Sequence, residues 1–209
     1  MNFELAKDHV FSLLKTGLKP SLYYHNFQHT IDVCAAVERL AQLEMIEGEN
    51  LVLLRTAAVL HDVGFLWEYL DNEIIACDFA RNTLGDFGYN NKQIESICQM
   101  ILSTKVPQNP TNILEMVLCD ADLDYIGRSD FFITALRLHR EWSENSQKKI
   151  TFKEWYLKQQ AFIAQHQFFT ESAKKLRNEK KMHNLVQIGE LLGLLDSTNT
   201  GQLGKFSRN

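Results

Sequence analysis

One segment indicates both the fold and the chemistry of this chain: Leu51-Val52-Leu53-Leu54-Arg55-Thr56-Ala57-Ala58-Val59-Leu60, followed at once by His61-Asp62-Val63-Gly64. The first ten residues are nearly all apolar and have the length of a buried helix. A hydrophobic core rarely needs a histidine beside an aspartate. Gly64 marks the end of the helix, where the backbone can deviate and bring both neighbouring side chains to one site. The negative end of the helix dipole also favours a cation there.

Two further polar motifs accompany this pair. Tyr24-His25-Asn26-Phe27-Gln28-His29 lies upstream, and Cys119-Asp120-Ala121-Asp122-Leu123-Asp124 lies downstream. His25 and His29 are about one helical turn apart, so they can face the same way. Asp120 follows an apolar run, where a carboxylate is costly unless it is paired or bound to a metal. Together the three motifs offer one imidazole, then an imidazole with a carboxylate, and then another carboxylate, a set of ligands that suits a divalent metal.

The bulk composition limits the class of protein. The chain has 209 residues, 45% apolar and 23% charged, which is ordinary for a globular domain with a substantial core. A net charge of -4 argues against bulk nucleic-acid binding. No apolar run reaches 18 residues, so no membrane span is expected, and the N-terminus does not resemble a signal peptide. Four widely spaced cysteines fit reduced core positions and a cytoplasmic protein.

Helical spacing dominates, with only 3 prolines and 10 glycines, so the sequence predicts an all-α fold. We expect a single compact domain of about eight to ten helices over residues 1–195 and a flexible polar tail over 196–209. The predicted helices cover about residues 2–16, 50–63, 90–103, 129–144, 151–169 and 170–195. Three more begin near residues 26, 71 and 112; the first stops before Gly48, the second fades around residues 85–88, and the third contains Asp120.

The three motifs, in this order and spacing, resemble the HD superfamily of metal-dependent phosphohydrolases over about residues 20–145. The Tyr-His-Asn-x-x-His start is similar to the signature of class I cyclic-nucleotide phosphodiesterases, and the stretch from Asp120 to Gly127 resembles an uncharacterised bacterial branch. The resemblance implies a helical HD-domain fold. It also implies that metal-activated water is the nucleophile and that four residues bind the metal, namely His29, His61, Asp62 and Asp120.

The resemblance further implies that His25 protonates the leaving oxygen, so His25 and Asp62 are the predicted catalytic residues. Asp120 is preferred to Asp122 because the family ligand is usually the first acid after the apolar run. Asp122 and Asp124 are then supporting acids or partners of basic residues. Lys105 and Arg128 flank the site in sequence and could bind phosphate oxygens, although for either residue alone a place on the solvated surface is the favoured reading.

The expected cofactor is one divalent transition metal, namely Mn, Fe, Co, Ni or Zn. No histidine occurs between His61 and His139, so a fully liganded second metal is not expected. A weak second Mg²⁺ could still be held by Glu68, Asp71 or Glu73. The aromatic C-terminal half would suit a homodimer face.

The predicted activity is hydrolysis of a small phosphate ester, with a nucleotide favoured and cyclic nucleotides as one option. Two alternatives remain open at this stage. The chain could be a catalytically inactive metal- or nucleotide-binding regulatory module. Less favoured is an iron-dependent oxygenase on the same scaffold, because relatives of that kind use extra histidines after the His-Asp pair.

Overall fold

The chain folds entirely into helices in the computed structural model, which describes residues 1–145 and 149–202, with side chains up to residue 197. Three short 3-10 segments accompany the α-helices: η1 (Val63–Leu66), η2 (Leu84–Phe87) and η3 (Asp124–Gly127). The α-helices are α1 (Phe3–Gly17), α2 (Phe27–Leu43), α3 (Gly48–Leu60), α4 (Asn72–Thr83), α5 (Asn91–Ser103), α6 (Ile113–Asp122), α7 (Phe131–Asn145), α8 (Phe152–Gln165) and α9 (Glu171–Gln202).

The all-α prediction is therefore confirmed, and each predicted helix corresponds to one of these nine. The last helix differs most, because α9 continues to Gln202 instead of ending near Leu195. The predicted flexible tail is thus helical up to that residue, and residues 203–209 lie outside the described part. In the described residues, none of the helices combines the length and the apolar character that a bilayer span requires.

Helix α3 is the centre of the N-terminal half. It packs against α1, α2, α5 and α6, and its residues from Thr56 to Leu60 are all buried. Leu54 and Leu60 are completely removed from solvent. Each such side chain contributes about 1.5–3 kcal/mol of hydrophobic stabilisation. The second half of the apolar run is therefore enclosed in the core, and the residues after it emerge in the middle of the fold.

Side-chain caps fix where several helices begin. Asn90 and Gln93 form a capping box at the start of α5, and Thr151 and Glu154 form one at the start of α8. Both have the sequence spacing of a capping box, in which the cap residue is followed three positions later by Gln or Glu. The Asn112 side chain caps α6 by accepting from two backbone N–H groups. Each such cap stabilises its helix by about 1 kcal/mol and sets the direction in which the helix leaves the loop.

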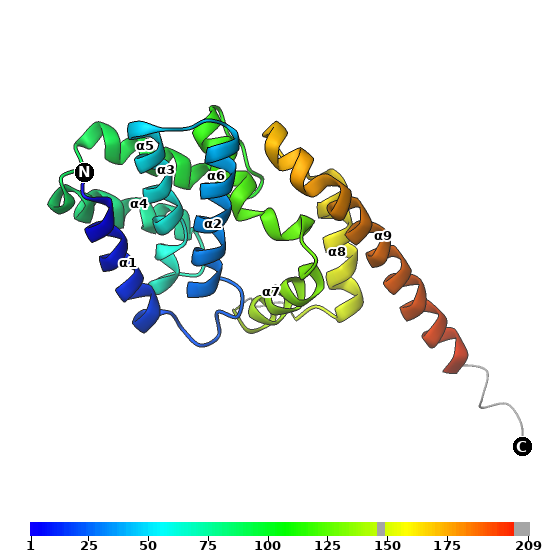
Figure 1. Ribbon diagram of the computed structural model, residues 1–209. Helices are drawn as coiled ribbons and strands as arrows, with labels where there is room; N and C mark the ends of the chain where they lie inside the picture. Colours follow the sequence, from blue (N-terminus) through cyan, green and yellow to red (C-terminus); the bar gives the residue numbers. More distant parts are fainter. Residues whose placement is uncertain (146–148, 203–209) are drawn as a thin grey trace, which may run out of the picture.

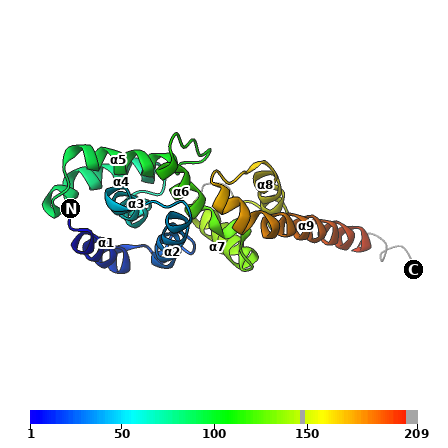
Figure 2. The same cartoon turned by 45° about the horizontal axis from the view of Figure 1, so that its top comes forward.

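Helices α1–α6 form one side of the molecule, and α7–α9 lie on the other side, with α9 projecting away towards the C-terminus (Figure 1, Figure 2). An ion-pair cluster joins the start of α9 to η3 and α2. Asp124 accepts from Arg177 at 2.6 and 2.9 Å and from Arg39 at 3.1 Å. Gly127 allows this contact, because a Cβ there would lie 2.7 Å from the Arg177 carbonyl oxygen. Asp124 is therefore a partner of basic residues, one of the two roles expected for it.

All four cysteines are free thiols, and Cys77, Cys98 and Cys119 are buried. Their positions agree with the reduced core role expected from the sequence.

Candidate metal centre and active-site cavity

Four side chains from three helical segments converge beside the end of α3. His29 lies in the first turn of α2, His61 and Asp62 follow α3 directly, and Asp122 is the last residue of α6. The Nε2 atom of His29 lies 3.2 Å from Asp122 Oδ1, 3.3 Å from Asp62 Oδ2 and 3.3 Å from His61 Nε2. His61 Nε2 lies 3.2 Å from Asp62 Oδ2. Two imidazole nitrogens and two carboxylate oxygens thus face one point.

Asn26 determines how His29 enters this cluster. Its Oδ1 atom accepts from the backbone N–H groups of Gln28 at 2.9 Å and of His29 at 3.2 Å, so Asn26 is the N-cap of α2. The cap places His29 at the third helical position, on the face turned towards α3 and α6. The asparagine of the Tyr-His-Asn-x-x-His motif therefore has a structural role. It fixes the residue at which α2 begins and so determines the orientation of His29.

The chain breaks from helical geometry directly after His61. His61 keeps helical angles, whereas Asp62 has φ -111° and ψ 9°. Both side chains therefore reach the cluster, as the sequence predicts. Gly64 is needed for close approach and not for a positive φ. A Cβ at Gly64 would lie 2.0 Å from the carbonyl oxygen of Asn72, so only glycine lets the start of α4 pack here.

The hydrogen bonds of the cluster leave its ligand atoms free. His61 Nδ1 lies 2.8 Å from the carbonyl oxygen of Ala58, an acceptor, so Nδ1 carries the proton and Nε2 presents its lone pair. Asp62 Oδ2 is buried and makes no hydrogen bond of good geometry within the described residues, although both imidazoles are near. A buried carboxylate oxygen without a partner is costly, and a cation at this point would stabilise it.

The electrostatics also favour positive charge in this cluster. Burial lowers the pKa of His29, but Asp122 and Asp62 outweigh this and raise that pKa to about 10. Burial also lowers the pKa of His61, but the nearby Asp62 carboxylate outweighs this effect, so the pKa of His61 is raised. The pKa of Asp62 falls well below its usual range because the nearby imidazoles outweigh its burial. The donor set of two imidazoles and two carboxylates therefore fits a divalent transition metal, which would replace the imidazole protons.

The expectation for Asp120 is corrected by the geometry. Its carboxylate turns away from the histidines and accepts from the backbone N–H groups of Phe169 and Thr170 and from the Thr170 hydroxyl, each at 2.8 Å. Residues two apart on a helix point about 200° apart, so Asp120 and Asp122 cannot face the same site. Asp122 lies beside His29 and His61 and is the carboxylate that could hold the metal with them. Asp120 holds the start of α9.

His25 is held by a glutamate that the sequence motifs do not indicate. Glu141 of α7 has no solvent exposure and forms an ion pair with His25 Nδ1. It also accepts from the backbone N–H groups of Tyr24 at 2.7 Å and His25 at 3.0 Å. The His25 ring stacks on Phe65 with centroids 4.3 Å apart and lies 5.8 Å from the His29 ring. This arrangement fixes the imidazole beside the metal cluster. Glu141 contacts its Nδ1 atom, and Nε2 is the ring nitrogen that Glu141 does not contact.

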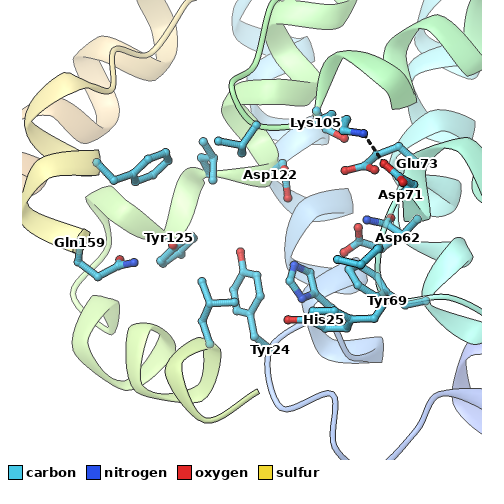
Figure 3. A pocket seen from close by; sticks show the side chains of 18 residues that line it. Tyr24, His25, Asp62, Tyr69, Asp71, Glu73, Lys105, Asp122, Tyr125 and Gln159 are labelled. Carbon is cyan, nitrogen blue, oxygen red and sulfur yellow. Dashed lines mark hydrogen bonds and ion pairs between the residues drawn. The ribbon is translucent and has the colours of Figure 1, made fainter. Parts of the chain in front are cut away.

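A cavity of about 550 Å³ opens over this cluster, and its wall includes His25, Asp62 and Asp122 (Figure 3). Lys105 lies on the same wall, where it pairs with Asp71 at 2.5 Å. This volume is within the range of pockets that bind small organic ligands. A metal at the cluster would thus be reachable from the cavity through Asp62 and Asp122.

Arg128 is placed differently from Lys105. It lies in a second, smaller cavity of about 290 Å³ on the His29 side of the cluster. There it bonds Asp32 at 3.0 Å and forms an ion pair with Asp130. The structure therefore does not bring Arg128 into the cavity of Lys105, and the expectation that Arg128 binds phosphate stays a prediction.

The residues expected to hold a weak Mg²⁺ are only partly near the site. Asp71 and Glu73 line the large cavity, and burial raises the pKa of Glu73. Glu68 is not among the lining residues. A second ion therefore stays a prediction.

Comparisons with known proteins agree with this geometry. Residues 26–124 match the HD domain family. An uncharacterized protein of Clostridium beijerinckii is 36% identical over 81 residues, a match that covers 37% of this chain and 51% of that protein. The chain thus matches about half the length of this relative.

Two solved structures share the fold. A protein described as a predicted HD superfamily hydrolase from an uncultured Thermotogales bacterium has a TM-score of 0.58 and 20% identity, with 92% of each chain covered. A Lactobacillus plantarum protein has a TM-score of 0.68 and 19% identity, with 96% of this chain and 100% of that chain covered. His29, His61, Asp62 and Asp122 all lie within residues 26–124, the segment of the chain that matches the HD domain family.

Proposed function

We propose that the protein is a metal-dependent hydrolase that cleaves a small phosphate ester, with a nucleotide as the favoured substrate. The observation that carries this proposal is the position of the two-imidazole, two-carboxylate cluster at the wall of a ligand-sized cavity that also presents a lysine. His29, His61, Asp62 and Asp122 would hold one divalent transition metal. Such an ion supplies Lewis acidity, which activates water and neutralises charge on a phosphoryl oxygen.

His25 is the proposed proton donor of the reaction. The oxygen of water forms a bond to phosphorus, the ester P–O bond breaks, and the leaving oxygen takes the proton from His25 Nε2. The proton of the attacking water is released to solvent, from which His25 is protonated again. General acid catalysis of this kind contributes about 10²–10⁴-fold to a rate.

Glu141 is a positioning residue in this proposal. Its carboxylate holds Nδ1 of His25 and the backbone N–H groups of Tyr24 and His25, so the ring has one orientation and Nε2 remains for the substrate. Glu141 acts through His25 and does not itself contact the substrate.

Lys105 is the proposed phosphate contact. Its side chain is half-exposed, and its bond partner Asp71 lies on the same cavity wall. An incoming phosphate oxygen would replace the Asp71 carboxylate as the acceptor of the ammonium group.

The test combines metal content and turnover on the full chain purified without chelator. Wild type should contain about one transition metal per chain and hydrolyse 4-nitrophenyl phosphate or a nucleoside monophosphate. Asp62→Ala should lose both properties, because it removes a ligand, whereas His25→Gln should keep the metal and lose turnover. Full hydrolysis by Asp62→Ala would refute the proposal. Tight nucleotide binding without product would favour the regulatory-module alternative, and oxygen consumption would favour the oxygenase.

A further inference from the structure

The ionic side chains of the large cavity are mostly acids. Its wall includes four carboxylates, namely Asp62, Asp71, Glu73 and Asp122. Lys105 is the one lysine of this wall, which holds no arginine among the residues that the structure describes. A phosphate group is recognised by positive charge, and each further phosphate requires more of it. The cavity is therefore a poor match for a ligand that carries several phosphates.

Glu73 differs from the other carboxylates of this wall. A metal at the cluster would balance the charges of Asp62 and Asp122. Asp71 forms an ion pair with Lys105 at 2.5 Å. Glu73 is half-buried at the start of α4, and its carboxylate forms no ion pair or hydrogen bond with another side chain of the described residues. Because Figure 3 shows it beside Asp71 and Lys105, its negative charge acts on a ligand at the metal end of the cavity.

The surroundings of the cavity offer no further cation to a longer phosphate chain. A neighbouring cavity of about 530 Å³ shares Leu123 and Phe162 with it, and neither lysine nor arginine is found among the described residues that line this neighbour. Arg128 lines the smaller cavity described above, where Asp32 and Asp130 already neutralise it. A second phosphate beside the metal would therefore meet acidic side chains without a cation to balance its charge.

We propose that the cavity selects esters with a single phosphate and rejects diphosphates and triphosphates, an inference that rests on the phosphoesterase function proposed above. Lys105 and the metal bind the one phosphate. Glu73 is the specificity-determining residue, because its carboxylate repels a second phosphate that is joined to the first through a bridging oxygen. Repulsion of this kind weakens the binding of the wrong ligand and leaves the contacts of the right one in place. The substrate class is thus a monophosphate ester of an organic alcohol.

The test measures kcat/KM of the full chain for the 5′-monophosphates and 5′-diphosphates of the four common nucleosides. The assays are run at about pH 8, where carboxyl groups are charged, and without added magnesium, which would screen them. Glu73→Gln keeps the length of the side chain and removes its charge. Glu68→Gln is the matched control, because Glu68 is exposed and does not line the cavity. For the best nucleoside, wild type and Glu68→Gln should prefer the monophosphate about 100-fold, and Glu73→Gln should prefer it about tenfold or less.

Wild type that hydrolyses diphosphates as efficiently as monophosphates would overturn the inference while leaving the proposed function intact. So would a Glu73→Gln protein that keeps the full wild-type preference. If wild type hydrolyses none of the esters, the proposed function fails, and calorimetric binding of inorganic phosphate and pyrophosphate decides the inference separately. Wild type should then bind phosphate about tenfold more tightly than pyrophosphate, and Glu73→Gln should bind the two about equally. Pyrophosphate binding by wild type that is as tight as phosphate binding, or binding of neither, would contradict it.

Discussion

Asp120 and Asp122 are only two residues apart, and alanine at each should have a different effect. Asp122→Ala removes one of the four atoms that face the cluster, so the metal content should fall from about one to below about 0.1 per chain. Its effect on the free energy of unfolding of the metal-free protein should be about 1.5–3 kcal/mol, because within the described residues this carboxylate pairs with the buried imidazoles of His29 and His61.

Asp120→Ala should leave the metal in place and destabilise the protein. The substitution removes the acceptor of three hydrogen bonds of 2.8 Å at the start of α9. Each buried donor left without an acceptor costs about 1–3 kcal/mol. The Thr170 hydroxyl can rotate and Phe169 is only half-buried, so we expect a total loss of about 2–4 kcal/mol. For a chain of this size this lowers Tm by roughly 10 °C.

The assay is metal content by mass spectrometry together with thermal unfolding after chelator treatment. Asp120→Asn is the matched control, because it keeps one carbonyl oxygen as an acceptor and should fall between wild type and Asp120→Ala in Tm. A folded Asp120→Ala protein with unchanged Tm and no metal would refute the assignment. So would an Asp122→Ala protein that retains a full complement of metal.

Three further perturbations test other parts of the structure. Gly64→Ala should destabilise by more than about 3 kcal/mol, measured by urea unfolding, because its Cβ would clash with the Asn72 backbone; an effect below 1 kcal/mol would contradict this packing. Burial lowers the pKa of His166 to about 4, so the unfolded chain binds this proton more strongly, and stability present above about pH 6.5 is lost as pH falls towards 4. His166→Gln should remove about 1–2 kcal/mol of that pH dependence, after discounting for solvent screening, and parallel unfolding curves for the two proteins would exclude it. Asp124→Asn should weaken the bidentate pair with Arg177 and cost about 2–3 kcal/mol without changing metal content; loss of metal from the folded variant would show that our separation of the two sites is wrong.

The sequence predicts the helices well because their signals are local. The capping boxes that begin with Asn90 and Thr151 and the apolar run before His61 each fix an element without reference to the rest of the chain. The end of α9 is less certain from sequence, because polar helix and polar coil have similar composition beyond Leu195.

The site is predicted only in part, since much of it depends on tertiary contacts. Asp120 and Asp122 both follow the same apolar run, and only the packing of α6 decides which acid faces His29. Glu141 lies 116 residues after His25, in a helix whose sequence gives no sign of a catalytic partner.

The last turn of α6 has a mechanical consequence. Asp122 on one side faces the metal cluster, and Asp120 on the other side accepts from Phe169 and Thr170, the two residues that precede α9. Both residues lie in the same helical turn, so a metal that restricts the motion of Asp122 also restricts the motion of Asp120. Metal loading should therefore slow amide hydrogen exchange at Phe169 and Thr170, although neither residue contacts the ion. The beginning of the long C-terminal helix would then act as a built-in reporter of occupancy at the metal cluster.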